Sequence, residues 1–425
     1  MATTVVTSEA EFDTAWASVS AGDIIEFADG TYAGMTLNTV ASSGTVTAPI
    51  TIRAQNRNGA VINGAGNIAI RSSYIIVDGF YFDGITINST MRLANGCVGS
   101  KIKNCYFYQC GPVSASQAVV RIESSSTGNL VEGCTFDGSN QLGIRLDVAG
   151  SDLCQHNTIK GNLFVNTTTT DSPCIQIGQD QTEQLDGYNI VESNTFDNCS
   201  TGSELISNKT NYNIFRDNLF LNCDSPLTLR GGAYCDVIGN RMIGGDTGLR
   251  LYGHDHNIIG NVIHGGSGTG IKIYCGTATT PGASTQAAQD CLVAGNTIHG
   301  CNNGIRVNGD YTVTTNEALP ACDISANLLI ANTLNDYVVA EQADGNTLTE
   351  NTTGSDPGFI NIAGDDFRLN TQITAGKFWT GETPTGNDGL RYMIPPSRGS
   401  EEVRGMAVGA RVLPAGVDVA RARVA

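Results

Sequence analysis

The residues that point most clearly to chemistry are Lys209 and Arg230, in the segment SELISNKTNYNIFRDNLFLNCDSPLTLRGG at residues 203–232. They are 21 residues apart, which is about one coil of a stacked β-repeat. Equivalent positions on successive coils lie about 4.8 Å apart, so two cationic side chains would lie side by side on one face. Such a pair suits the binding of an acidic sugar and the removal of a proton next to its carboxylate.

The reaction that these two residue types favour is β-elimination from a uronate. The C5 proton is weakly acidic, because the adjacent carboxylate is already negative. A lysine flanked by other cations loses its own proton more readily and can act as the base near neutral to mildly alkaline pH. An arginine stays charged and suits stabilisation of the developing negative charge. The alternative for Lys209 is an ordinary lysine in a turn.

A repeat in the sequence predicts the elements that would position this pair. An Asn followed by aliphatic or aromatic residues recurs, with steps of 24, 22 and 21 residues between Asn194 and Asn261. A second series of short strands runs in phase with it: GIRL (143–146), CIQI (174–177), LTLR (227–230), GLRL (248–251), GIKI (270–273) and GIRV (304–307). This pattern predicts an all-β chain, a right-handed parallel β-helix in which Asn side chains hydrogen-bond between coils. The Asn residues of the repeat are Asn104, Asn162, Asn194, Asn218, Asn240, Asn261, Asn296 and Asn327.

The domain organisation follows from where the repeat begins and ends. Ser8 and Glu11 form a capping-box pattern, which predicts a helix over residues 8–19 that covers the N-terminal end of the β-helix. We predict one catalytic domain over residues 1–385. Residues 386–425 lose the repeat and are expected to form a C-terminal cover or tail.

A row of cations is expected along the same sheet. The residues in the middle of the in-phase strands, with Arg121 as an upstream extension, are Arg145, Gln176, Glu204, Thr228, Arg250, Lys272 and Arg306. The chain carries a formal net charge of −17, so cations gathered in one row indicate a groove for an extended anionic polymer. The alternative is that these are ordinary solvated positions on the outside of a sheet.

The composition argues against nucleic acid and membranes as partners and bears on the cellular location of the protein. The net charge of −17 would repel nucleic acid, and no apolar span is long enough to cross a membrane. The 13 cysteines form no CxxC pair, and the spacing of Cys199, Cys223 and Cys301 predicts buried thiols rather than disulfides or zinc ligands. The N-terminus as given has no signal-peptide pattern. We expect a monomer that is secreted or periplasmic in a bacterium, with a cytoplasmic protein as the alternative.

These motifs resemble those of polysaccharide lyase family 6, the alginate lyases and chondroitinase B, over about residues 3–370. The family carries an ExEIISNKS-like motif, an LTLRHG motif one coil later and a G-V-R-I…G-x-D-H element. Here they read ELISNKT (204–210), LTLRGG (227–232) and GLRLYGHDH (248–256), and residues 21–56 resemble the family's opening coil. The resemblance implies a lyase acting on an acidic polysaccharide, most simply alginate. It implies Lys209 as base and Arg230 as acid, with Arg250 and His256 contacting the substrate. The cation row adds Arg145, Gln176, Lys272 and Arg306 as substrate-binding residues, together with Tyr252.

The sequence departs from the family where the family binds calcium through an Asn and two Glu. Glu204 matches one ligand, but Gly202 stands in place of the other Glu, and the Asn position falls at Thr170 or Asp171. Calcium takes about six to eight oxygen ligands, so this set is poor. We therefore predict no cofactor and a supporting role for Glu204, and if calcium does bind, Glu204 and Asp171 are the expected ligands. Gly231 and Gln176 replace a family His and a family Arg, which puts the substrate preference in doubt.

Two other functions stay open. The element YGHDH (252–256) resembles that of mannuronan C5-epimerases, in which case Tyr252, Asp255 and His256 would be catalytic. A non-catalytic or phage-type β-helix that binds a glycan is the other alternative. Formation of unsaturated ends, exchange at C5 without new ends, and binding alone would distinguish the three.

Overall fold

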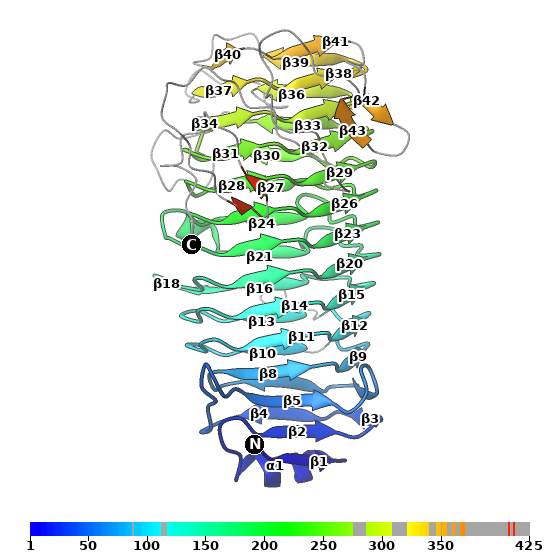
Figure 1. Cartoon of the computed structure of the whole chain (residues 1–425), viewed down its shortest axis with the longest axis vertical. Helices are drawn as coiled ribbons and strands as arrows, with labels where there is room; N and C mark the ends of the chain where they lie inside the picture. The colour runs from blue at the N-terminus through cyan, green and yellow to red at the C-terminus, as the bar shows by residue number, and fades with distance from the viewer. Residues whose placement is uncertain are drawn as a thin grey trace. The chain divides into compact units, whose positions relative to one another are not determined.

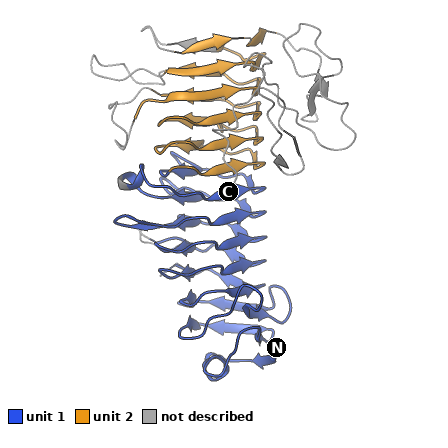
Figure 2. Ribbon diagram, turned by 60° about the vertical axis from the view of Figure 1, so that its left-hand side comes forward, with its two compact units in different colours: residues 1–210 blue, residues 211–425 orange. Residues whose placement is uncertain are grey.

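The computed structural model describes residues 1–86, 89–111, 117–274, 286–307, 321–339, 346–349, 351–354, 359–361, 366–369, 407–408 and 411–412. The chain forms two compact units, Met1–Thr210 and Asn211–Ala425 (Figure 2). In each unit the chain passes in turn through three parallel sheets, and within these sheets a strand pairs with the equivalent strand of the next coil (Figure 1). This is a parallel β-helix, so the predicted all-β fold class is confirmed.

In unit 1 each sheet gains one strand per coil. The first sheet contains β1 (Thr3–Val6), β2 (Ile24–Phe27), β5 (Ile50–Ala54), β8 (Ile75–Asp78), β11 (Lys101–Lys103), β14 (Leu130–Glu132), β19 (Thr158–Lys160) and β22 (Ile190–Glu192). The second contains β3 (Gly30–Ala33), β6 (Ala60–Asn63), β9 (Tyr81–Asp83), β12 (Tyr106–Tyr108), β15 (Thr135–Asp137), β20 (Leu163–Val165) and β23 (Thr195–Asp197). The third contains β4 (Thr36–Thr39), β7 (Asn67–Ile70), β10 (Met91–Leu93), β13 (Val120–Ile122), β16 (Ile144–Leu146), β21 (Ile175–Ile177) and β24 (Ile206–Asn208).

Unit 2 repeats the same order of sheets. Its first sheet contains β25 (Ile214–Arg216), β28 (Asp236–Ile238), β31 (Asn257–Ile259), β34 (Gln289–Ala294), β37 (Ala321–Ser325) and β40 (Thr347–Thr349). Its second contains β26 (Leu219–Leu221), β29 (Arg241–Ile243), β32 (Val262–His264), β35 (Thr297–His299), β38 (Leu328–Ile330) and β41 (Thr352–Gly354). Its third contains β27 (Leu227–Leu229), β30 (Leu249–Leu251), β33 (Thr269–Ile273), β36 (Asn303–Val307) and β39 (Asn335–Val339).

The remaining elements are short. Two hairpins, β42 (Phe359–Asn361) with β43 (Asp366–Leu369) and β44 (Ala407–Val408) with β45 (Arg411–Val412), are antiparallel. The hairpin of β17 (Val148–Ala149) and β18 (Asp152–Leu153) and the 3-10 helix η1 (Asp180–Thr182) lie in turns of unit 1. Apart from β44 and β45, the predicted cover at residues 386–425 lies outside the described residues, and the predicted boundary at residue 385 stays a prediction.

Burial alternates along many of the short strands, which explains the sequence pattern. In β13 the side chains of Val120 and Ile122 are buried and Arg121 points outward, whereas in β12 the middle residue, Phe107, is the buried one. The buried phenylalanines of the second sheet of unit 1 stack coil on coil, with ring centroids 4.6 to 4.9 Å apart from Phe82 to Phe196. The third sheet therefore presents polar middle residues outward while the core stays apolar.

The predicted Asn ladder is confirmed within each unit. Asn162 Nδ2 donates to Asn194 Oδ1 over 3.0 Å in unit 1, and Asn240 Nδ2 donates to Asn261 Oδ1 over 3.0 Å in unit 2. The prediction for Asn104 was wrong: it precedes this column by one residue, and Cys105 takes the place in the column. The cysteines of the described residues are buried thiols, as predicted, and Cys275 lies outside the described residues.

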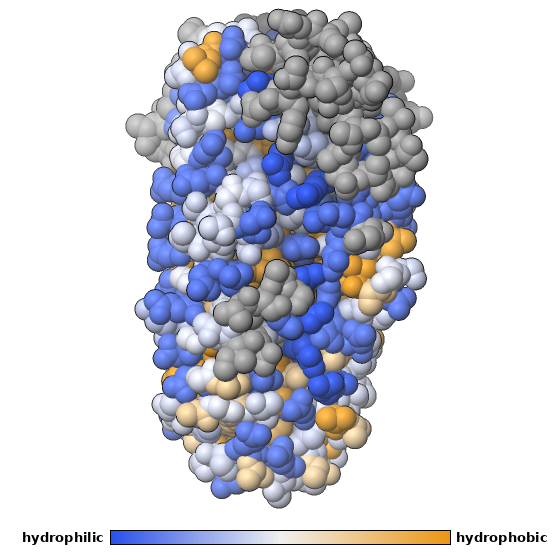
Figure 3. Space-filling view, turned by 180° about the vertical axis from the view of Figure 1, so that it is seen from behind, coloured by the Kyte–Doolittle hydropathy of each residue, from blue (hydrophilic) through white to orange (hydrophobic). Residues whose placement is uncertain are grey.

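The N-terminal helix is also present, although it is shorter than predicted. It is α1 (Glu9–Trp16), and Ser8 Oγ accepts a hydrogen bond from the Glu11 N–H over 3.3 Å. Phe12 and Trp16 are its buried residues, so it covers the core at this end of unit 1. No helix among the described residues is long and apolar enough to cross a membrane. The face shown in Figure 3 is mostly hydrophilic, with small scattered hydrophobic areas.

Candidate active site

The outer face of the third sheet of unit 1 carries a column of polar residues in register. Arg92 pairs with Arg121, Arg121 with Arg145, and Arg145 with Gln176. Gln176 then pairs with Ser207 rather than with Glu204. The prediction that Glu204 belongs to this row was therefore wrong, because β24 begins at Ile206. Arg92 extends the row by one coil beyond the predicted Arg121.

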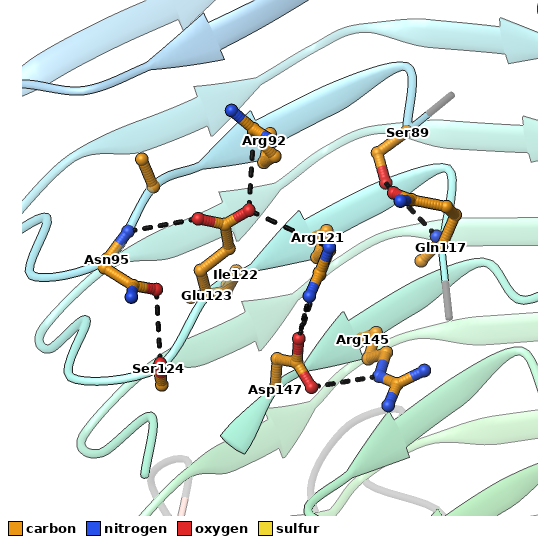
Figure 4. Close-up of polar contacts among 12 residues, drawn as sticks. Ser89, Arg92, Asn95, Gln117, Arg121, Ile122, Glu123, Ser124, Arg145 and Asp147 are labelled. Carbon is orange, nitrogen blue, oxygen red and sulfur yellow. Dashed lines mark hydrogen bonds and ion pairs between the residues drawn. The ribbon is translucent and has the colours of Figure 1, made fainter. Parts of the chain in front are cut away.

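A second column, two residues further along each strand, lies on the same face and is acidic. Glu123 Oε1 lies 3.3 Å from Arg92 Nε, and the Arg121 Nε–H donates to Asp147 Oδ2 over 2.9 Å (Figure 4). Asp147 Oδ1 also lies 3.3 Å from Arg145 Nε. Burial raises the pKa of Asp147, but the Arg121 hydrogen bond and the Arg145 charge outweigh it and lower that pKa below its usual value.

The acidic column changes the character of the predicted groove in unit 1. Three guanidinium groups face two carboxylates, so most of the positive charge on these coils is matched within the protein. Arg145 is only 7% exposed, so its contact with Asp147 is largely shielded from water. We interpret these residues as an ion-pair ladder that fixes the side chains of the sheet. The role of Arg145 in substrate binding stays a prediction.

Lys209 directly follows β24 and lies at the corner where the chain leaves the third sheet. Its backbone N–H donates to the Ile177 carbonyl over 2.9 Å, which continues the register of the sheet past Asn208. This register places Lys209 in the same column as Glu123 and Asp147. The Lys209 Nζ lies 2.7 Å from Asp180 Oδ1, and the Lys209 side chain is 12% exposed. The predicted base therefore lies on the outer face, where its side chain is largely shielded from solvent but not fully buried.

The structure around Glu204 shows which of the family's calcium ligands this chain can provide. Glu204 is buried, with 3% of its surface exposed, and Asp171 Oδ1 accepts a hydrogen bond from Ser203 Oγ over 2.7 Å. Gly202 has φ +76°, and a Cβ built there would lie 2.0 Å from the Thr170 carbonyl oxygen. A glutamate at this position would require the backbone to move, so the turn itself excludes the second Glu of the family's set.

The residues present do not fit the calcium set of the family. Among the described residues, no group of three or more His, Cys, Asp or Glu side chains could hold a metal ion. Calcium takes about six to eight oxygens, several of them anionic, and Glu204 and Asp171 supply two carboxylates between them. We derive no catalytic step through a metal.

In unit 2 the predicted cations do lie in register on the third sheet. Thr228 pairs with Arg250, Arg250 with Lys272, and Lys272 with Arg306. Thr228 is buried, whereas the three cationic side chains are half-buried. Cations on three neighbouring coils, about 4.8 Å apart, form a positive strip that could bind a chain of regularly spaced carboxylates. We call Arg250, Lys272 and Arg306 the cationic strip.

Arg230 begins a second column beside the cationic strip. It directly follows β27, as Tyr252 follows β30 and Tyr274 follows β33. The Tyr252 N–H donates to the Leu229 carbonyl over 2.9 Å, and the rings of Tyr252 and Tyr274 stack with centroids 4.8 Å apart. Arg230 is half-buried, and Gly232 beyond it has φ +84°. The column thus places a half-buried guanidinium group in register with a stacked pair of tyrosine rings that are themselves buried.

His256 does not occupy the position that the sequence predicted. It is fully buried, its Nδ1 accepts a hydrogen bond from the Cys235 N–H over 3.1 Å, and its Nε2 donates to the Tyr252 carbonyl over 2.9 Å. Burial is the main cause that lowers its pKa to about 3, so the ring is neutral and structural. The prediction that His256 contacts substrate was therefore wrong.

Of the predicted epimerase residues, His256 uses both ring nitrogens to bond to backbone groups. Asp255 Oδ2 contacts His254 Nδ1 over 2.9 Å, and the side chains of both are partly exposed. His256 bonds to the backbone carbonyl of Tyr252 and not to its hydroxyl. No general acid or base that uses Tyr252 and His256 together is assembled here, which disfavours the epimerase alternative.

Unit 1 also contains an open polar cavity of about 580 Å³ at the turns that follow the third sheet. Its lining includes Ser125, Asp152, Gln155, Gln184 and Asp186. Gln155 Nε2 donates to the Asp186 carbonyl over 2.8 Å. The two carboxylates make this cavity a poor place for an anionic sugar, so we do not assign it to the substrate.

Comparisons with known proteins agree with this architecture. The family model described as chondroitinase B matches residues 6–363. The PL6 family alginate lyase AlyGC has 20% sequence identity and a TM-score of 0.73, over 83% of this chain and 51% of that protein. The chain thus spans about half the length of AlyGC. A PL6 polysaccharide lyase, Pedsa3628 from Pseudopedobacter saltans, has 16% identity and a TM-score of 0.71, over 91% of this chain and 98% of that one.

A third similar structure is a mannuronic acid specific polysaccharide family 6 lyase from human gut microbiota. It has 20% identity and a TM-score of 0.65, over 84% of this chain and 87% of that protein. At these identities the likeness shows a shared fold. No curated protein matches the sequence.

Proposed function

The chain belongs to the chondroitinase B family of polysaccharide lyases, as its motifs predicted, and we propose that it cleaves a uronate-containing polysaccharide, most simply alginate, by β-elimination. The observation that carries this proposal is the placement of Lys209. It lies on the outer face of the third sheet, with its Nζ held at 2.7 Å from a carboxylate. That is the position of the lysine in the family motif, and lysine is one of the residue types that can abstract a proton next to a carboxylate.

In this proposal Lys209 takes the C5 proton of a uronate. The C5–H bond breaks and a new N–H bond forms on the neutral amine. The electron pair of the C5–H bond becomes the C4=C5 double bond, and the C4–O4 bond breaks. The departing oxygen takes a proton from Arg230 or from water, and the guanidinium group stabilises the negative charge that develops at the uronate.

The substrate class is supported by charge. The cationic strip matches a polymer with regularly spaced carboxylates, and Gln176, Arg145 and Tyr252 are proposed as further contacts. Alginate is favoured because AlyGC is named as an alginate lyase and the gut enzyme as mannuronic acid specific. Glu204 is buried just before β24, the strand that Lys209 follows, and is proposed to support the start of that strand. Monomeric state and a secreted or periplasmic location are also proposals.

The deciding experiment is incubation of the purified protein with alginate. Formation of unsaturated sugar ends, followed by their ultraviolet absorbance, is the expected result. Uptake of solvent deuterium at C5 without new chain ends would instead indicate an epimerase. Binding without either reaction would indicate a glycan-binding β-helix. Chondroitin sulfate and polygalacturonate, tested in parallel, would show whether another uronate is the substrate.

The cationic strip predicts a salt-dependent affinity. We expect Arg250→Ala and Lys272→Ala each to raise KM about three- to tenfold at low salt, because each removes a charge from a partly desolvated anion site. Raising the ionic strength should raise the wild-type KM and reduce the difference in KM between wild type and the two variants. Lys101→Ala, at an exposed position of the first sheet, is the control and should leave KM unchanged. A KM that does not change with salt concentration would show that the cationic strip does not bind the polymer.

Metal removal should have little effect on the reaction. Because Gly202 lacks the carboxylate of the family's second glutamate, we expect the protein to keep most of its activity after treatment with EDTA and exchange into metal-free buffer. The measurement is the rate of formation of unsaturated ends before and after treatment, with and without added calcium. Loss of activity that calcium alone restores would contradict this prediction. Asp171→Ala would then be the first variant to examine, since Asp171 is the other available carboxylate.

A further inference from the structure

The ion pair of Asp180 with Lys209 has no counterpart in the sequence motifs. Asp180 belongs to η1, in the turn at residues 178–189 that leaves β21, one coil before Lys209. The turn after β24 that carries Lys209 is much shorter, reaching β25 at Ile214. The longer turn therefore extends beside the shorter one and brings a carboxylate to the Lys209 Nζ.

The turn that carries Asp180 is anchored at several points. The Thr182 hydroxyl accepts from the Gln179 N–H over 3.0 Å and donates to the Gln179 carbonyl over 2.8 Å. It also lies 3.4 Å from the Lys209 carbonyl, and Thr182 is 1% exposed. Gln179 Nε2 donates to Asp147 Oδ1 over 3.2 Å, which ties the turn to the ion-pair ladder. The backbone of Asp180 is therefore fixed on both sides, unlike that of a typical surface ion pair.

Asp180 supplies the carboxylate that contacts the Lys209 Nζ within unit 1. The residue that the register places opposite Lys209 on the preceding coil is Gly178, which has no side chain to hold it. Asp147, the next carboxylate in the column, is already bonded to Arg121 and to Gln179. A lysine side chain has four flexible bonds, so without an anchor its amine would sample many positions.

We propose that Asp180 is a positioning residue for the base: its carboxylate holds the Lys209 Nζ in place and stabilises the ammonium group that forms when Lys209 takes the C5 proton. This inference rests on the proposed function. When the reaction starts from the neutral amine, Lys209 gains positive charge in the transition state, so a nearby carboxylate lowers the barrier of that step, as an aspartate does for the histidine of a catalytic triad. The same carboxylate repels an anionic polymer, so it should not assist ground-state binding. Asp180 is thus expected to contribute to kcat and not to KM.

The test compares Asp180→Ala and Asp180→Asn with wild type in the formation of unsaturated ends. For each protein kcat is taken at the alkaline plateau of its pH profile, so that the base is neutral in every case. Asp180→Ala should lower kcat about 10- to 100-fold, because the Lys209 amine loses both its anchor and the nearby negative charge. Asp180→Asn keeps the size and one acceptor oxygen but loses the charge, so it should still lower kcat at least about tenfold. KM should stay the same or fall in both, because one negative charge near the polymer is gone. Asp186→Asn, in the same turn and bonded to the Tyr188 hydroxyl, is the matched control and should keep wild-type kcat.

The outcomes separate the inference from the proposed function. An active wild type with Asp180→Asn at wild-type kcat would overturn the inference alone, as would a change in KM without a change in kcat. A wild type that forms no unsaturated ends on any uronate polymer would overturn the proposed function and this inference with it. Thermal denaturation of each variant shows whether it is folded. If Asp180→Ala does not fold, the comparison of Asp180→Asn with wild type decides the test.

Discussion

Replacement of Lys209 by alanine is expected to lower the formation of unsaturated ends by about 10²- to 10⁴-fold, the range that a general base contributes. The reason is that no other amine in the described part of unit 1 follows the third sheet in this column. The Lys209 side chain is 12% exposed and its partner Asp180 is 45% exposed, so the truncation leaves no buried charge behind. We expect the free energy of unfolding to change by about 1 kcal/mol or less.

Lys209→Arg separates the role of a base from that of a positive charge. Arginine can keep an ion pair with Asp180 but stays protonated throughout the accessible pH range, so it cannot accept the C5 proton. We expect this variant to bind polymer and to be nearly as inactive as Lys209→Ala. Lys160→Ala is the matched control, because Lys160 lies on the first sheet of the same unit and pairs with Glu192 at 3.1 Å. Lys209 is not the base if Lys209→Ala keeps more than about a tenth of the wild-type rate.

The sequence was sufficient for those features that repeat from coil to coil. Asn162 and Asn240 form the predicted ladders because one buried amide satisfies the backbone of the next coil, so the same residue recurs with the repeat. The middle positions of the third sheet, such as Arg121 and Lys272, were likewise found from alternation along the strand.

The features that the sequence did not reveal depend on turns and on register. Glu204 was placed in the cation row because the pattern put the strand too early, and Ser207 is the residue in register. His256 was predicted at the surface, but the turn after β30 directs its ring inward to the Cys235 N–H. Asp180 was not identified because it lies in an insertion whose path sets the contact, and insertions carry no repeat.

The acidic column was not predicted, because only the middle residue of each strand in the third sheet was considered. Glu123 and Asp147 stand two residues after Arg121 and Arg145, so they share the outer face, and only the register of adjacent coils brings Arg121 to Asp147. A sequence search of positions two residues after each cation would have found them.

Replacement of Arg230 by alanine is expected to lower kcat about 10²- to 10³-fold, which is the loss typical when a group that stabilises a developing anion is removed. Arg230 directly follows β27 and is half-buried on the outer face, in the column of Tyr252 and Tyr274. A planar guanidinium group can bind both oxygens of a uronate carboxylate, and that carboxylate becomes more negative as the C5 proton leaves.

Arg230→Lys should recover only part of the activity, because an ammonium group keeps the charge but not the two parallel hydrogen bonds. The measurement is kcat and KM for both variants on the polymer that wild type cleaves, with thermal denaturation to show that they fold. Arg216→Ala, on the first sheet of the same unit, is the control and should keep wild-type kcat. If Arg230→Ala raised KM and left kcat unchanged, Arg230 would bind the substrate and its transition state equally, and another group would have to stabilise the developing charge.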